Sequence, residues 1–258
     1  MGLRRFFSIL RLDKRGMAIA ISKKRRTLAN ELSAQMDHTV KYGPFLGMKF
    51  SPENWWSSSD RAGMLLGIYE KEILESMMNL PKSRDIFIDL GAADGYYSVG
   101  VLVSRRFKKS YAFEISPKGR SVIKKNALLN KVSGGLEVFG EATKSFYSQI
   151  PRDNLNRAVI LIDIEGAEFN LIDSVVLKAL RKSIIFIELH EWFFTDGDKK
   201  LKKLLIDAKP FFKVSKLTTT SRDLSLFPEL SKLNDSERWL IASEGRNRLM
   251  TWLRLDPI

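Results

Sequence analysis

The chain has 258 residues, of which 44% are hydrophobic, and a formal net charge of +13. This length and hydrophobic content suit one α/β domain with an appendage. The absence of cysteine excludes disulfide frameworks, thiolate zinc sites, iron–sulfur clusters and cysteine nucleophiles. No stretch approaches the roughly 18 apolar residues of a membrane-spanning helix, and the N-terminus has no secretory pattern, so we expect a cytoplasmic protein.

The positive charge is concentrated at the N-terminus. Residues 1–30 carry nine Lys or Arg and one Asp, so the rest of the chain is only mildly basic. Residues 1–12 can form a helix with four apolar side chains on one face: Leu3, Phe6, Phe7 and Leu10. Such a basic amphipathic helix can lie on an anionic membrane surface, for example the inner face of the cell membrane. The alternatives are a solvated terminus and a helix docked on its own domain.

The chain divides into three parts by composition. We expect residues 1–40 to form a basic N-terminal extension, 41–84 a cover and lead-in segment, and 85–258 the ligand-binding domain. The turn-rich stretch 41–61 contains Trp55 and Trp56, which either cover the ligand edge of the sheet or pack in the core. A helix is expected over residues 61–79.

The central motif is the stretch 85–98. A short apolar run, residues 86–88, indicates a buried parallel strand that ends at Asp89. Gly91 and Gly95 follow at positions where a turn bends sharply or a backbone approaches a ligand, and residues 96–103 can form a helix. Strand, glycine turn and helix together are typical of a nucleotide site at the carboxyl edge of an α/β sheet.

The spacing of this motif is D-x-G-x-x-x-G rather than the G-x-G-x-x-G of dinucleotide-binding folds. An acidic residue at the strand tip would repel a pyrophosphate but suits a cationic ligand with an ammonium and a sulfonium group. The stretch resembles motif I of class I S-adenosylmethionine-dependent methyltransferases. An ordinary strand–turn–helix in some other α/β protein is the alternative.

Strands and helices alternate along the rest of the chain, which predicts a doubly wound, mostly parallel, seven-stranded Rossmann-like sheet. Helices are expected from Pro117 to about Asn130, from Phe169 to Leu180 and from Lys199 to Lys209. The remaining strands are expected at residues 110–115, 136–139, 158–164, 183–189, 211–217 and 238–243.

Acidic residues end most of these strands. The carboxyl ends of parallel strands share one edge, and unpaired buried carboxylates cost several kcal/mol, so these residues predict a site. Glu114, 25 residues beyond Asp89, can accept both hydroxyls of a ribose. The others are Glu141, Asp163 and Glu165, and the pair Glu188 and His190. A Mg²⁺ ion held by Asp163, Glu165, Glu188 or His190 is chemically sensible.

Three stretches resemble the FkbM-type methyltransferases: Phe87–Gly95, Leu161–Glu168 (L-I-D-I-E-G-A-E) and Ile185–His190. Gly67-Ile-Tyr-Glu70 is also similar to the family's segment before motif I. The resemblance covers about residues 60–191, and Asp94 departs from the asparagine often found in the glycine turn.

The resemblance implies methyl transfer from S-adenosylmethionine, often to a hydroxyl of a sugar or polyketide. By position, Asp89, Gly91 and Gly95 would hold the methionine part, Glu114 the ribose, and Glu141 with Ala142 the adenine rim. Ala92, Asp94 and Asp163 complete the expected cofactor set.

A hydroxyl acceptor is a weak nucleophile, so a general base should help. His190 and Asp163 are the candidates, with Glu165 beside them, and a purely structural role for His190 is the alternative. The expected partner is a small-molecule or glycan acceptor. A nucleic-acid methyltransferase is less favoured because no Asn/Asp-Pro-Pro-aromatic stretch is present. A non-catalytic module that keeps the fold is the third hypothesis.

Overall fold

The computed structural model describes residues 14–246 and 248–258. The amphipathic helix expected at residues 1–12 therefore lies outside the described residues. Within the described ranges, every helix is too short or too polar to cross a bilayer.

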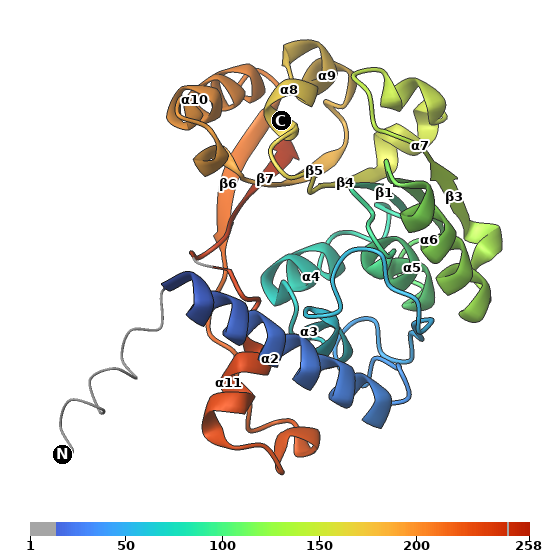
Figure 1. The fold of residues 1–258 in the computed structure, drawn as a ribbon. Helices are drawn as coiled ribbons and strands as arrows, with labels where there is room; N and C mark the ends of the chain where they lie inside the picture. Colours follow the sequence, from blue (N-terminus) through green and yellow to red (C-terminus); the bar gives the residue numbers. More distant parts are fainter. Residues whose placement is uncertain (1–13, 247) are drawn as a thin grey trace, which may run out of the picture.

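Seven strands form one sheet in the order β3-β2-β1-β4-β5-β7-β6, which confirms the expected fold (Figure 1). All neighbouring strands are parallel except that β7 runs antiparallel to both β5 and β6. Their bounds are β1 Ile86–Leu90, β2 Lys109–Phe113, β3 Leu136–Phe139, β4 Ala158–Ile162, β5 Ile184–Glu188, β6 Phe212–Thr218 and β7 Thr251–Pro257.

Helices cover both faces of the sheet, and the strands supply apolar side chains to both. In β1, Phe87 packs into one core, and Ile86 and Ile88 pack into the other, because successive side chains point to opposite faces. One core contains residues of α2 Lys14–Gln35, α3 Arg61–Leu65, α4 Lys71–Met78, α5 Tyr96–Val103, α6 Pro117–Leu129 and α11 Asp235–Ala242. The other contains residues of α7 Arg152–Arg157, α8 Glu168–Leu171, α9 Ser174–Ala179 and α10 Gly197–Ala208.

Four short 3-10 turns complete the described elements. They are η1 Ser133–Gly135, η2 Phe146–Gln149, η3 Glu191–Phe193 and η4 Pro228–Leu230.

The single helix expected over residues 61–79 is wrong, because α3 and α4 are separate. Gly67 between them has a φ of +65°, and a Cβ there would lie 2.4 Å from the carbonyl oxygen of Tyr42. Glu70 also has a left-handed backbone, with a φ of 45°. The break turns the chain back against residue 42 and leaves the Glu70 side chain buried at the sheet's edge.

The strand expected over residues 238–243 is also wrong. All of these residues except the last belong to α11, which begins with a capping box: Asn234 accepts from the backbone N–H of Glu237, and the Glu237 side chain accepts from that of Asn234. This N-x-x-E signal outweighs the apolar run that suggested a strand. The seventh strand is β7, close to the C-terminus.

The helix expected after β4 is interrupted. α8 ends at Leu171, Ile172 is extended, and Asp173 caps α9 by accepting from the backbone N–H groups of Val175 and Val176. The aspartate therefore starts a new helix rather than continuing the first.

Helix α2 packs against the domain through its second half, where Leu28, Leu32 and Met36 are buried. Arg25 donates to the carbonyl oxygen of Ser243 at 2.8 Å and to Asp60 at 2.6 Å. Helix α2 therefore links the segment after α11 to the start of α3. The segment after α11 contributes a residue to the candidate site.

Candidate active site

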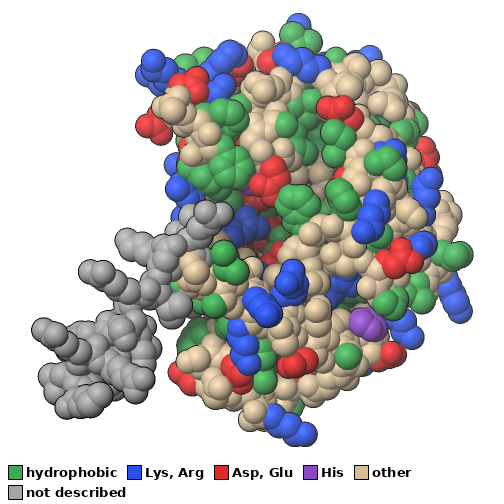
Figure 2. All heavy atoms as spheres, in the orientation of Figure 1, with side chains coloured by type: hydrophobic (Ala, Val, Ile, Leu, Met, Phe, Trp, Pro, Cys, Tyr) green, Lys and Arg blue, Asp and Glu red, His purple; other side chains and the backbone are tan. Residues whose placement is uncertain are grey.

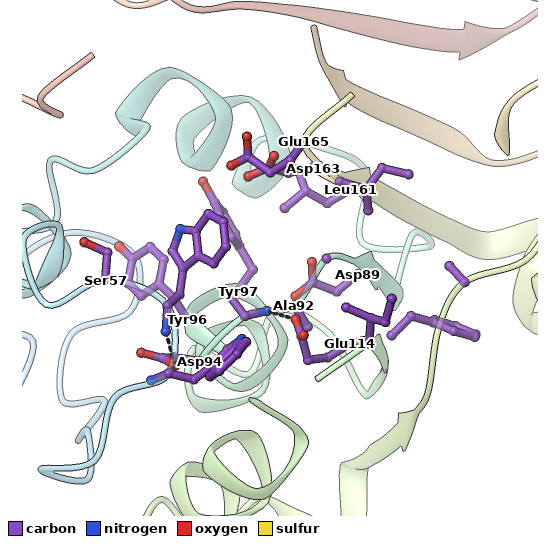
Figure 3. Close-up of a pocket in the computed structure, with 18 of the residues that line it drawn as sticks. Ser57, Asp89, Ala92, Asp94, Tyr96, Tyr97, Glu114, Leu161, Asp163 and Glu165 are labelled. Carbon is purple, nitrogen blue, oxygen red and sulfur yellow. Dashed lines mark hydrogen bonds between the residues drawn. The ribbon is translucent and has the colours of Figure 1, made fainter. Parts of the chain in front are cut away.

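A cavity of about 350 Å³ opens at the carboxyl ends of β1, β2 and β4. Its size lies within the roughly 300–1,000 Å³ typical of small-molecule sites. Figure 2 shows acidic side chains within a hollow of the surface and hydrophobic ones along its rim. Nine of the predicted site residues line the cavity: Asp89, Gly91, Ala92, Asp94, Glu114, Glu141, Ala142, Asp163 and Glu165. In the close-up, Asp163 and Glu165 lie on the side opposite Asp94 and Glu114 (Figure 3).

The glycine turn brings two backbone segments together. Gly91 has a φ of +93°, and a Cβ on it would lie 1.8 Å from the carbonyl oxygen of Asp163. Gly95 has a φ of +82° and precedes the first residue of α5. The backbone turns after β1 and β4 therefore come into contact at Gly91. This contact places Asp89 and Asp163 beside the same cavity.

Asp89 is buried at the end of β1, with a relative exposure of 2%, and accepts a hydrogen bond from the hydroxyl of Ser98. The pKa of Asp89 is raised to about 7, chiefly by burial and also by the charges of Asp163 and Glu114, while the hydrogen bond from Ser98 acts in the opposite direction. A carboxyl group in this environment gains most from a ligand that brings positive charge.

Glu114 is held in place by backbone donors. One carboxylate oxygen accepts from the N–H of Ala93 at 2.9 Å and the other from that of Ser116 at 2.8 Å. A carboxylate has about four acceptor positions, so each oxygen keeps one for a ligand. Gly119 provides the space, since a Cβ there would lie 2.7 Å from Cγ of Glu114 and 2.9 Å from Cδ1 of Trp55.

Asp94 holds the tryptophan segment. Its carboxylate accepts from the backbone N–H groups of Trp55 at 2.8 Å and Trp56 at 3.3 Å, and from Arg61 at 3.3 Å. Both tryptophans line the cavity, and they are 38% and 55% exposed. The segment is therefore a cover at the cavity mouth and not part of the core, and the carboxylate of Asp94 fastens that cover.

The predicted base candidates gather after β4 and β5. His190 is buried at 2% exposure and is not among the cavity-lining residues, whereas Asp163 and Glu165 are. Its Nε2 lies 3.8 Å from Asp163 Oδ1, 3.5 Å from Glu165 Oε2 and 3.6 Å from Glu188 Oε2. Burial alone would lower the pKa of His190, but the hydrogen bond with Glu168 and the nearby carboxylates raise it.

The structure contains a buried ion-pair cluster that the sequence does not predict. Arg246 donates to Glu188 and, at 2.7 Å, to Glu70, whose exposures are 1% and 4%. Burial raises the pKa of Glu188 and raises that of Glu70 to about 8, while the Arg246 guanidinium favours the ionised form of both. No motif indicates Arg246, because it lies beyond the strand expected at residues 238–243 and belongs to no expected element.

Tyrosines form an aromatic wall beside this cluster. Tyr69, Tyr96 and Tyr97 line the cavity, and the Tyr97 hydroxyl donates to Glu70 at 2.6 Å. The Tyr96 hydroxyl is buried without a hydrogen-bond partner. A buried orphan hydroxyl on a cavity wall is available to a ligand.

No family model matches the sequence, and no curated protein matches it. Solved structures with a similar chain path include a ribosomal protein L11 methylase from Lactobacillus delbrueckii (13% identity, 81% of this chain and 84% of that one, TM-score 0.48). Others are the tRNA methyltransferase TrmK of B. subtilis (10%, 70% and 64%, 0.44) and TYW2 of P. horikoshii in complex with MeSAdo (17%, 82% and 65%, 0.46). These likenesses are too distant to assign an activity to this chain.

Proposed function

We propose that this chain is an S-adenosylmethionine-dependent methyltransferase that acts on a hydroxyl group of a sugar, a glycan or another small molecule. One observation carries the proposal: Asp89 and Glu114 end adjacent strands and share one cavity with aromatic walls. Two carboxylates at neighbouring strand ends suit a ligand that combines a cationic group with a ribose diol and repel a pyrophosphate.

The described residues fit S-adenosylmethionine. Asp89 has a raised pKa and would favour the ligand's ammonium, while each Glu114 oxygen keeps an acceptor position for a ribose hydroxyl. The unpaired Tyr96 hydroxyl can donate to the ligand's carboxylate. When bound, the cofactor supplies an electrophilic methyl group on a sulfonium.

The acceptor is expected at the side of the cavity lined by Asp163 and Glu165 (Figure 3). Burial and the charge of Asp163 raise the pKa of Glu165, which makes it a better proton acceptor for a hydroxyl. His190 lies behind these two side chains, so we assign the contact with the acceptor to Asp163 or Glu165. His190 would then orient them and tune their charge.

Much of the rate acceleration would come from positioning the hydroxyl oxygen in line with the methyl carbon and the sulfur. Such pre-organisation is worth about 7–11 kcal/mol in favourable intramolecular systems. The FkbM-type resemblance of three motifs favours a sugar or polyketide hydroxyl as the acceptor.

A nucleic-acid acceptor is the second candidate, and the net charge of +13 favours it. Six acidic residues line the cavity, however, and these would repel a phosphate backbone. A methyltransferase-like module that binds without turnover is the remaining alternative.

The proposal is tested by incubating the purified chain with methyl-labelled S-adenosylmethionine and a cell extract. We expect label in the glycan or small-molecule fraction, resistant to nuclease and protease. Nuclease-sensitive label would establish the second candidate instead. Cofactor binding without any transferred label would favour the module that lacks turnover.

A further inference from the structure

The cluster formed by His190, Asp163, Glu165 and Glu188 has the geometry of a metal site. Carboxylate clusters alone do not establish one, but two buried atoms in this cluster lack any hydrogen-bond partner: Asp163 Oδ1 and Glu188 Oε2. The Glu188 side chain is 1% exposed, and its Oε2 faces Nε2 of His190. An unpaired carboxylate oxygen buried in this way is stabilised only by a proton or a cation.

The histidine ring is oriented as a metal ligand would be. Its Nδ1 lies 3.3 Å from Glu168 Oε1, and the same oxygen accepts from the His190 backbone N–H at 3.0 Å. The other Glu168 oxygen accepts from the N–H of Gly166 at 2.8 Å, so the carboxylate is fixed on both sides. In metal sites, a histidine usually binds the ion through one ring nitrogen and donates a hydrogen bond from the other to a carboxylate. Glu168 is placed to be that carboxylate.

The distances around Nε2 suit a central ion better than a hydrogen bond. The three facing oxygens lie 3.5–3.8 Å from Nε2, beyond the roughly 2.7–3.2 Å of an N–H···O bond. Ligand atoms around one ion with bonds of about 2.0–2.2 Å lie up to about 4.4 Å apart, which covers these separations. Ligand atoms of Asp163, Glu165 and His190 all lie within 4.8 Å of one another.

We propose that His190 Nε2, Asp163 Oδ1 and Glu165 Oε2 bind a divalent first-row transition-metal ion, with Glu188 Oε2 beside it as a further ligand. One imidazole and several carboxylates suit Mn²⁺, Fe²⁺ or Zn²⁺ better than Mg²⁺, which prefers oxygen alone. The charges agree. The carboxyl groups of Asp163, Glu165, Glu168 and Glu188 lie 3.3–3.8 Å from a ring nitrogen of His190. The guanidinium of Arg246 pairs with Glu188 but is shared with Glu70 and Glu244.

Asp163 and Glu165 also line the cavity, so the ion would face into it. In a methyltransferase, it would be placed to bind and polarise the acceptor hydroxyl. This consequence rests on the proposed function, whereas binding of the ion rests only on the residues described above.

The two histidines of the chain allow a direct test with Mn²⁺, without cofactor or acceptor. The ring signals of the chelator-treated full chain are followed by NMR as Mn²⁺ is added. The paramagnetic ion should broaden the signals of His190 at substoichiometric amounts. His38, whose Nδ1 is bonded to the Ser33 hydroxyl at 2.8 Å, is the internal control and should stay sharp. Equal broadening of both, or of neither, would overturn the proposal.

A matched pair of variants tests the ligands by titration calorimetry with Mn²⁺. Glu165→Gln should weaken binding about tenfold or more, the size of change seen even for outer partners of metal sites. Glu137→Gln, whose side chain is equally exposed at 47% but lies outside the cluster, should bind as the unaltered chain does. Equal affinity in the two variants would remove Glu165 from the site. If methyl transfer fails while Mn²⁺ binds, only the proposed function is wrong.

Discussion

The carboxylates on the two sides of the cavity differ in their hydrogen-bond partners. After β1 and β2, Asp89 and Glu114 are fixed by a hydroxyl and by backbone N–H groups. After β4 and β5, Asp163 and Glu188 each keep a buried oxygen without a partner. The first side is pre-organised to bind a ligand, and the second has more carboxylates than the guanidinium of Arg246 can pair with. We therefore assign cofactor binding to the first side and cation-assisted chemistry to the second.

The largest expected effect of a substitution falls on the second side. Arg246→Met removes the guanidinium that Glu70 and Glu188 share. Breaking a buried ion pair by removing one partner costs about 3–5 kcal/mol, so urea unfolding should show a loss of that size. Arg248→Met is the control, since Arg248 is exposed and lies over the Trp192 ring. Similar stabilities of the two variants would show that the cluster is not held by Arg246.

On the first side, Asp89→Asn should weaken S-adenosylmethionine binding about 10- to 100-fold. This range corresponds to the roughly 1.5–3 kcal/mol of a hydrogen bond to a charged group. Asp85→Asn is the control, because Asp85 is also buried but precedes the same strand and binds Arg157 and Lys108 away from the cavity. Calorimetry at a temperature where both variants are folded measures the difference. Undiminished affinity of Asp89→Asn would refute the assignment of Asp89 to the cofactor.

Asp89 also predicts a pH dependence of binding. Burial raises its pKa to about 7, and a cationic ligand binds its ionised form better. Below pH 7 the free protein holds a proton that binding must release, so affinity should fall by up to about tenfold for each pH unit. Above pH 7 this dependence should disappear. Titrations between pH 5.5 and 8 in the unaltered chain and in Asp89→Asn test this, and an equally steep slope in both would exclude Asp89 as its source.

The smallest effect is expected at the cover. Trp56 lines the cavity, and a tryptophan face contributes about 0.5–1 kcal/mol to binding a cation at an exposed site. Trp56→Ala should therefore weaken cofactor binding about two- to fivefold. Trp239→Ala on α11 is a control with the same exposure, 55%, outside the cavity. Identical affinities of the two variants would mean that the segment only shields the mouth.

The sheet was predictable because buried parallel strands are unbroken apolar runs. The site was predictable because acidic residues at the ends of such strands do not stabilise a core. That reasoning predicts that Asp89, Glu114 and Asp163 share one edge of the sheet, and all three line the same cavity. It failed where tertiary contacts decide the local structure. The chain breaks at Gly67 because the backbone of Tyr42 lies against it. Arg246 enters the site because Arg25 of α2 holds the carbonyl of Ser243 just before it, which no local pattern records.

The central claim is that the cavity after β1 and β2 binds S-adenosylmethionine. Titration calorimetry of the full chain with S-adenosylmethionine, and with NAD as the pyrophosphate-bearing control, tests it most directly. We expect saturable one-to-one binding of S-adenosylmethionine and no binding of NAD, whose pyrophosphate would meet the carboxylates of Asp89 and Glu114. Binding of NAD in preference to S-adenosylmethionine would contradict the account, as would binding of neither after Mn²⁺ and a candidate acceptor have been added.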